Sequence, residues 1–174
     1  KSTVSRILAT LEREGLVGRH PETGKYRLGL GLVSLAGVAL GRLNVRGASQ
    51  PHLPALVEAT HETVNVVVRD GGECVNVERE ASTRPIHYTG WIGRRMPLHC
   101  TAGGKVLIAW LPPAQREAIL PAPLRRYTAQ TLADPARLEA SLAAIVALGY
   151  AIDHDEFEEG FSAIAAPLRN HMGE

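Results

Sequence analysis

The segment from Leu30 to Leu43 constrains the fold of this chain more than any other part of its sequence. It predicts a helix with apolar residues around nearly its whole circumference. A surface helix of a monomer can bury only one face, so this helix either forms the core of one domain or packs against a second chain. Its position between a basic and an acidic segment favours a dimerising linker. Its apolar residues are Leu30, Leu32, Val33, Leu35, Ala36, Val38, Leu40 and Leu43.

Charge is distributed unevenly on the two sides of that helix. Residues 1–47 carry eight Lys and Arg residues against three Asp and Glu residues, whereas residues 48–174 carry eleven against fifteen. A small basic segment joined to an acidic one is typical of a phosphate-binding module fused to another domain. A basic face can equally be a solvated surface, so charge alone does not decide between the two.

The composition of the 174 residues, 45% hydrophobic and 21% charged, excludes disordered and collagen-like chains. The longest apolar run, residues 29–41, is shorter than the ~20 residues of a membrane-spanning helix, and no signal-peptide pattern opens the chain. Two cysteines, Cys74 and Cys100, are too few for a disulfide framework, and we expect buried free thiols. We therefore expect a cytoplasmic protein without a membrane partner.

The first 28 residues predict a helix followed by a basic hairpin. Ser2 is a good N-cap, the apolar residues Val4, Ile7, Leu8 and Leu11 recur at helical spacing, and Gly15 ends the helix. Residues 16–20 and 25–28 predict two strands joined by the turn at 21–24. This arrangement indicates the recognition helix and the wing of a winged helix, which would bind double-stranded DNA.

The polar side chains of this segment have the chemistry to contact DNA. Arg6 can donate two parallel hydrogen bonds to a guanine edge, and Thr3 and Ser5 can contact bases or phosphates. Basic residues of the hairpin would lie on the phosphate backbone. The candidate DNA-binding residues are Ser2, Thr3, Ser5, Arg6, Thr10, Arg19, Lys25 and Arg27.

Residues 48–174 predict an α+β domain with an antiparallel sheet flanked by helices. Two β-branched runs, 63–69 and 74–79, flank the turn at 70–73, and a third strand is expected at 86–89. The helices are expected at 49–60, 105–111, 114–120 and 135–148, the last between the Asp134-Pro135 cap and Gly149, and two more strands at 150–153 and 161–169. The helix residues expected to be buried are Leu53, Leu56, Val57, Leu138, Leu142, Ile145 and Val146.

An enzyme with a thiolate nucleophile would need Cys100 to contact a base such as His99. Neighbours along a strand point to opposite faces, which argues against that contact. We expect no catalytic residue. The spacing of His87, His99 and Cys100 matches no closed zinc site, so we expect neither a metal nor a cofactor.

Three motifs resemble the IclR family of bacterial transcription regulators. Residues 2–17 are similar to the recognition helix and the start of the wing in that family. Residues 97–105, with the sequence PLHCTAGGK, and residues 153–167, with DHDEFEEG followed by AAP, are similar to its effector domain.

The resemblance implies a partial winged helix-turn-helix over residues 1–28, a linker helix over 29–47 and a GAF-like effector-binding domain over 48–174. It also implies assembly as homodimers or tetramers. The first helices of the DNA-binding domain and the last strand and helix of the effector domain are missing from this sequence. We therefore expect a fragment that is incomplete at both ends.

The resemblance further implies an effector pocket. Thr101 opens a helix, whose free amides and positive dipole end favour a carboxylate, although a plain N-capped helix explains the same residues. Gly103 would let a ligand approach the backbone. Asp153 would accept a hydrogen bond from an effector hydroxyl or amine, or form a surface ion pair. The candidate effector-binding residues are Tyr88, Thr101, Ala102, Gly103, Asp153, Phe161 and Ala163.

Together these features predict a ligand-responsive transcription regulator of the IclR type. Its operator affinity would respond to a small organic-acid or aromatic effector, because the expected pocket is partly apolar. The alternative is a stand-alone small-molecule sensor domain with a vestigial DNA-binding head.

Overall fold

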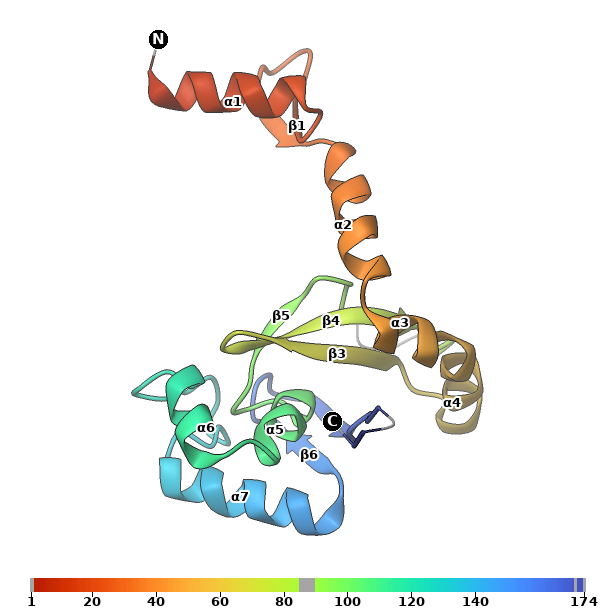
Figure 1. Cartoon of the computed structure of the whole chain (residues 1–174), viewed down its shortest axis with the longest axis vertical. Coiled ribbons are helices and arrows are strands. Elements are labelled where there is room, and N and C mark those ends of the chain that lie inside the picture. The colour runs from red at the N-terminus through yellow and green to blue at the C-terminus, as the bar shows by residue number, and fades with distance from the viewer. Residues whose placement is uncertain (1, 85–89, 171, 174) are drawn as a thin grey trace. The chain divides into compact units, whose positions relative to one another are not determined.

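The computed structural model of the chain describes residues 2–84, 90–170 and 172–173. The chain divides into two compact units, Lys1–Ala48 and Ser49–Glu174, and the elements of both are labelled in Figure 1. Within the described ranges, no helix combines the length and the apolar character needed to cross a bilayer.

The first unit begins with the predicted helix and hairpin. The helix α1 (Thr3–Arg13) starts at Ser2, whose side chain accepts a hydrogen bond from the Ser5 amide, and it is followed by Gly15 at a φ of +68°. Strands β1 (Val17–Arg19) and β2 (Tyr26–Leu28) pair antiparallel, which confirms the hairpin. The apolar helix is also confirmed, as α2 (Gly31–Gly41).

A short helix, α3 (Asn44–Ser49), leads into the second unit, where the 3₁₀ turn η1 (Gln50–His52) and α4 (Leu53–Thr60) follow. Strands β3 (Val64–Asp70), β4 (Glu73–Glu80) and β5 (Arg95–Pro97) form one antiparallel sheet. Three helices come next: α5 (Ala102–Ala109), α6 (Pro113–Ile119) and α7 (Pro135–Leu148). Strands β6 (Ala151–His154) and β7 (Ser162–Ala165) form a separate antiparallel pair.

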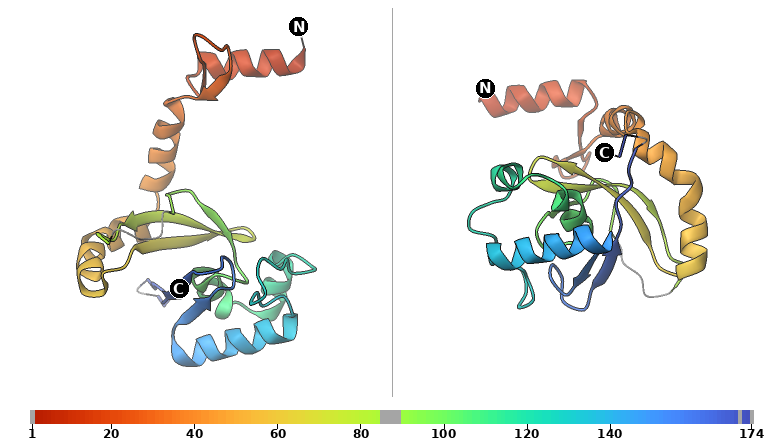
Figure 2. Two further views of the ribbon diagram at one scale, coloured as in Figure 1. Left: turned by 180° about the vertical axis from the view of Figure 1, so that it is seen from behind. Right: turned by 60° about the horizontal axis from the view of Figure 1, so that its bottom comes forward.

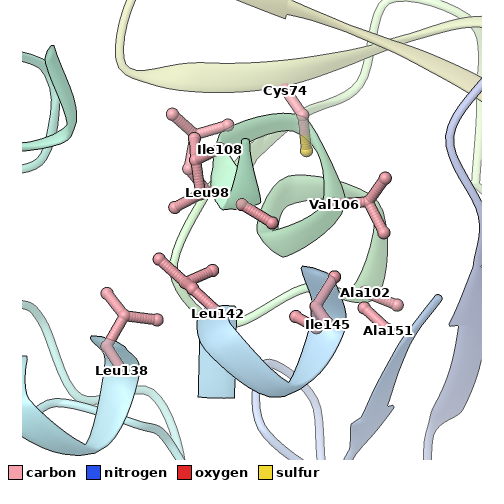
Figure 3. Close-up of a cluster of buried hydrophobic side chains, with 10 residues drawn as sticks. Cys74, Leu98, Ala102, Val106, Ile108, Leu138, Leu142, Ile145 and Ala151 are labelled. Carbon is pink, nitrogen blue, oxygen red and sulfur yellow. The ribbon is translucent and has the colours of Figure 1, made fainter. Parts of the chain in front are cut away.

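Helix α5 is the centre of the second unit. It packs against α7, against β3 and β4, and against β6 and β7, so that it lies between the three-stranded sheet and α7 (Figure 2). Figure 3 shows the buried side chains that these elements share. They are Cys74, Leu98, Ala102, Val106, Ile108, Ala109, Leu138, Leu142, Ile145 and Ala151.

Local signals account for the long helix α7. Asp134 accepts a hydrogen bond of 2.9 Å from the Arg137 amide, Pro135 occupies the first helical position, and Gly149 takes a φ of +84°. The predicted cap, start and end of this helix are therefore confirmed.

Several predictions about the second unit were wrong. The helix expected from Ser49 is regular only from Leu53, and the Ser49 side chain makes no capping hydrogen bond, because the segment between them turns as a 3₁₀ helix. Leu56 and Val146, expected in the core, are 48% and 44% exposed.

Further findings concern the strands and the start of one helix. The strand expected at 86–89 lies outside the described residues. The sheet contains a strand that the sequence did not predict, β5, which pairs with β4 from Glu73 to Val75. The helix expected from Lys105 begins at Ala102, because Thr101 provides its cap. The strand expected at 161–169 is regular only over β7.

Candidate functional site

Thr101 organises the start of α5, the first part of the expected pocket. Its hydroxyl accepts a hydrogen bond of 3.1 Å from the Gly104 amide and donates one of 2.8 Å to the Pro97 carbonyl. Thr101 and Ala102 are both buried, and the Ala102 methyl group belongs to the core cluster. Any ligand at this helix start would therefore meet backbone rather than these side chains.

Gly103 and Gly104 serve helix packing, a role that sequence reasoning did not assign to them. A Cβ at Gly103 would lie 2.7 Å from Cγ2 of Val67 on β3, and one at Gly104 would lie 2.6 Å from the Leu98 backbone. The glycines let α5 approach the sheet closely. A bulky substitution such as Gly103→Val would thus disturb the fold as well as any pocket, and it cannot test the pocket cleanly.

Asp153 and Ala163 are direct partners in the β6–β7 pair. Asp153 is buried and Ala163 is half-buried against the core cluster, so both face inward. Phe161, one residue before β7, is half-buried and shares that side by strand alternation. Because α5 packs against both strands, the structure brings α5 and these residues into one region of the unit. Tyr88 lies outside the described residues.

Asp153 occupies an unusual environment for a carboxylate. Burial raises the pKa of its carboxyl group to about 6, although its Oδ1 accepts a hydrogen bond of 2.9 Å from the Glu156 amide, which favours the charged form. The surface ion pair considered for Asp153 is excluded by this burial. A group with this pKa changes its charge close to neutral pH and can either donate or accept a hydrogen bond.

Sequence reasoning missed the buried ion pair next to Asp153. Lys105 Nζ lies 2.5 Å from Glu156 Oε1 and donates a 2.8 Å hydrogen bond to the Ile152 carbonyl. The Lys105 side chain is 2% exposed and that of Glu156 is 11% exposed. A lone lysine inside an otherwise apolar helix was the signal that could have found this pair, because such a lysine needs a partner when it is buried.

The geometry gives no support to a cysteine nucleophile. Cys100 is fully buried, and burial raises the pKa of its thiol to about 12. A ring nitrogen of His99 is hydrogen-bonded to the Arg125 carbonyl at 2.9 Å, and burial lowers the pKa of this histidine. Among the described residues, no three His, Cys, Asp or Glu side chains cluster as metal ligands would.

In the first unit, the candidate DNA-binding side chains are exposed, but some already have partners. The hydroxyl groups of Ser2 and Ser5 lie 3.2 Å apart, and Thr10 donates to the Arg6 carbonyl. Arg19 donates to the Tyr26 hydroxyl at 2.5 Å and lies over the Tyr26 ring.

Thr3, Arg6 and Thr10 line a shallow hollow of about 460 Å³ along α1, together with Ile7 and Leu11. Lys25 and Arg27 lie on the exposed hairpin. The hollow combines polar and apolar residues, and no residue of α1 is buried.

Comparison with known proteins defines the class. Residues 37–174 match the family described as bacterial transcriptional regulator IclR C-terminal. The chain is 39% identical over 173 residues to the HTH-type transcriptional regulator XynR of Escherichia coli, covering 98% of this chain and 68% of XynR. It is 38% identical to the HTH-type transcriptional regulator Rv1719 of Mycobacterium tuberculosis, covering 97% of this chain and 64% of that protein.

A solved structure of similar fold carries a ligand. An IclR homologue from Microbacterium hydrocarbonoxydans, complexed with 4-hydroxybenzoate, superimposes with a TM-score of 0.81 at 27% identity, covering 97% of this chain and 70% of that one.

The chain therefore belongs to the IclR family of bacterial transcription regulators. Its α+β unit has the fold of the IclR C-terminal effector domain. The chain spans about two thirds of the length of these relatives. The relatives are named as transcriptional regulators and not as enzymes.

Proposed function

We propose that this chain is the part of a ligand-responsive, DNA-binding regulator that holds its effector site and its recognition helix. The effector is a small organic acid or an aromatic compound, and the regulator acts on double-stranded DNA in the cytoplasm. The observation that carries the proposal is the buried carboxyl group of Asp153, in a pair of strands packed against the start of α5.

The effector site combines groups of two kinds. The start of α5 provides backbone amides and the positive end of a helix dipole, which suit a carboxylate. Asp153 provides a hydrogen-bonding group, and Phe161 and Ala163 provide apolar surface on the same side of the strand pair. The ligand of the Microbacterium homologue, 4-hydroxybenzoate, has the matching parts: a carboxylate, a ring and a hydroxyl group.

The first unit is the proposed DNA-binding part. Arg6 on α1 would contact base edges in the major groove, and Lys25 and Arg27 on the hairpin would contact phosphates. The exposure of all three side chains supports this assignment. Arg19 is the weakest of the basic candidates, because its guanidinium already interacts with Tyr26 and Glu12.

A second copy of the chain is the proposed partner of α2. No residue of this helix is buried, and Leu30, Val33, Leu35 and Val38 are 57–84% exposed. So many exposed apolar side chains on one helix indicate an interface. The effector would shift the assembly between arrangements that space the two recognition helices differently, and so change its operator affinity.

Calorimetry with paired ligands tests the effector site. We expect 4-hydroxybenzoate to bind more tightly than benzoate, because its hydroxyl group can bond to Asp153. Asp153→Ala should weaken the binding of 4-hydroxybenzoate about tenfold or more and leave that of benzoate nearly unchanged. Equal losses for both ligands would contradict the role of Asp153. A panel of short-chain and aromatic acids of which none binds would contradict the effector class.

A further inference from the structure

The turn that follows β6 is held by an element far away in the sequence. Lys105, on α5, contacts both sides of this turn: the Ile152 carbonyl at 2.8 Å and the Glu156 carboxylate at 2.5 Å. Between these two points lies Asp153, the proposed effector contact. The lysine therefore spans the segment that presents the Asp153 carboxyl group.

Glu156 fixes that carboxyl group directly. Its amide donates a 2.9 Å hydrogen bond to Asp153 Oδ1, so the direction of the carboxyl group depends on where the Glu156 backbone lies. Asp155, between them, has a φ of +58°, a conformation that residues other than glycine rarely adopt. Such a turn persists only where its surroundings hold it in place.

The loop before α7 also holds the turn. The Thr131 hydroxyl donates a 2.7 Å hydrogen bond to the Glu156 carbonyl, and the Thr128 hydroxyl donates one of 2.6 Å to the Asp155 carbonyl. Both threonines are buried. These bonds hold two carbonyl groups of the turn, and Lys105 adds a bond to the Ile152 carbonyl and one to the Glu156 side chain.

Stability alone does not explain a buried lysine at this place. Desolvation of two charges costs about as much as their attraction returns, and a well-packed apolar pair often stabilises a protein equally well. Apolar contacts have no preferred direction, however, so an apolar pair would not fix the orientation of the neighbouring backbone. The Lys105–Glu156 pair has two directed bonds, and both end on the segment that carries Asp153.

We propose that Lys105 and Glu156 are positioning residues: their ion pair fixes the segment 153–156, where β6 runs into the turn, and so aims the Asp153 carboxyl group at the effector. The inference rests on the proposed function of Asp153 as an effector contact. It adds that effector selectivity depends on two residues that need not touch the effector.

Amide hydrogen exchange tests the positioning without any effector. In Lys105→Met and Glu156→Ala, we expect the residue-156 amide to exchange roughly tenfold faster or more, relative to the amides of Leu142 and Ile145 in α7, because only the turn opens. Glu156→Gln keeps an acceptor for Lys105 but leaves the buried lysine without its counter-charge, so its residue-156 amide should exchange at a rate between those of the wild type and Glu156→Ala. Ile145→Val is the matched control, since a lost core methyl group should accelerate all these amides together.

Uniform acceleration in Lys105→Met and Glu156→Ala would overturn the proposal, because it would show only a loss of global stability. If Lys105→Met does not fold, the comparison of Glu156→Ala with Glu156→Gln gives the same answer. Equal behaviour of these two variants would also overturn it.

Calorimetry then tests the link to selectivity. We expect Glu156→Ala to lose the preference for 4-hydroxybenzoate over benzoate, and Glu156→Gln to keep more of it than Glu156→Ala does. If the turn opens in Glu156→Ala but the preference for 4-hydroxybenzoate over benzoate is unchanged, the link between the turn and selectivity is refuted. If the wild type binds no acid of the panel, the proposed effector class fails, whereas the exchange experiment still decides whether the pair positions Asp153.

Discussion

The carbonyl oxygen of Gly15 accepts a 3.0 Å hydrogen bond from the amide of Gly31, and this bond joins the end of α1 to the start of α2. A second bond of 2.8 Å runs from the Gly29 amide to the Leu16 carbonyl. Positions 29 and 31 leave no room for a side chain, because a Cβ at Gly29 would overlap the Gly15 carbonyl and one at Gly31 would lie 2.9 Å from it. The helix that carries Arg6 is thereby tied to the helix of the proposed interface.

We expect Gly29→Ala to destabilise the first unit by about 1–3 kcal/mol, because the added methyl group pushes against backbone that cannot move aside. Urea unfolding and the exchange of the Gly31 amide would measure this loss. Gly47→Ala is the control: Gly47 lies in α3 with open space where a Cβ would point, and alanine there should be neutral or slightly stabilising. A Gly29→Ala variant as stable as the wild type would show that the junction can make room for a methyl group at position 29.

The proposed role of α2 predicts that Leu35→Glu dissociates the assembly. Leu35 is 57% exposed in the single chain, and an unpaired carboxylate at an apolar interface costs several kcal/mol. Analytical ultracentrifugation should show a shift toward monomer. Ser34→Glu, which alters a position that is already polar, should have a smaller effect. An unchanged sedimentation coefficient in Leu35→Glu would remove this residue from the interface.

The proposed division between base contacts and phosphate contacts predicts two different defects in DNA binding. In the full-length protein, Arg6→Ala should reduce discrimination between operator and mismatched DNA by about 1–3 kcal/mol if Arg6 contacts guanine with two bonds. Lys25→Ala should weaken binding to all sequences and lower the salt dependence by about one unit. Fluorescence anisotropy at several salt concentrations measures both, and identical defects in the two variants would refute the division.

The parts of this fold that sequence predicted correctly depend on neighbours in the chain. The Ser2 cap, the Asp134-Pro135 start of α7 and the turn at 70–73 use bonds between residues at most a few positions apart. Residue types alone identify such signals. The alternation along β6 and β7, which turns Asp153 and Ala163 inward, is equally local.

The parts that sequence did not predict depend on distant contacts. Strand β5 exists because Met96 pairs with Cys74, and its three residues carry no alternating pattern of their own. Position 103 needs a glycine because Val67 packs against it. The spacing of residues along the chain cannot show this contact. Lys105 and Glu156 are 51 positions apart, so their pairing was visible only once the fold brought α5 to β6.

The raised pKa of Asp153 leads to a prediction about pH and stability. Burial raises this pKa from 3.8 to about 6, so between these values the folded protein holds a proton that the unfolded chain has released. The stability from this group is therefore complete below about pH 4 and is lost as the pH rises through 6. At neutral pH the folded state bears the cost of a buried charge.

Asp153→Asn removes the cost of the buried charge. It keeps an oxygen that can accept the hydrogen bond from the Glu156 amide. We expect the stability of this variant relative to the wild type to rise by about 1–3 kcal/mol between pH 4.5 and pH 7.5. Urea unfolding of both proteins at the two pH values measures the difference, and groups that both proteins share cancel in the comparison. A difference that is the same at both pH values would mean that Asp153 ionises in the folded protein as it does in the unfolded chain. A difference that falls as the pH rises would mean that ionised Asp153 stabilises the fold, and the neighbouring Lys105 would then be its main counter-charge.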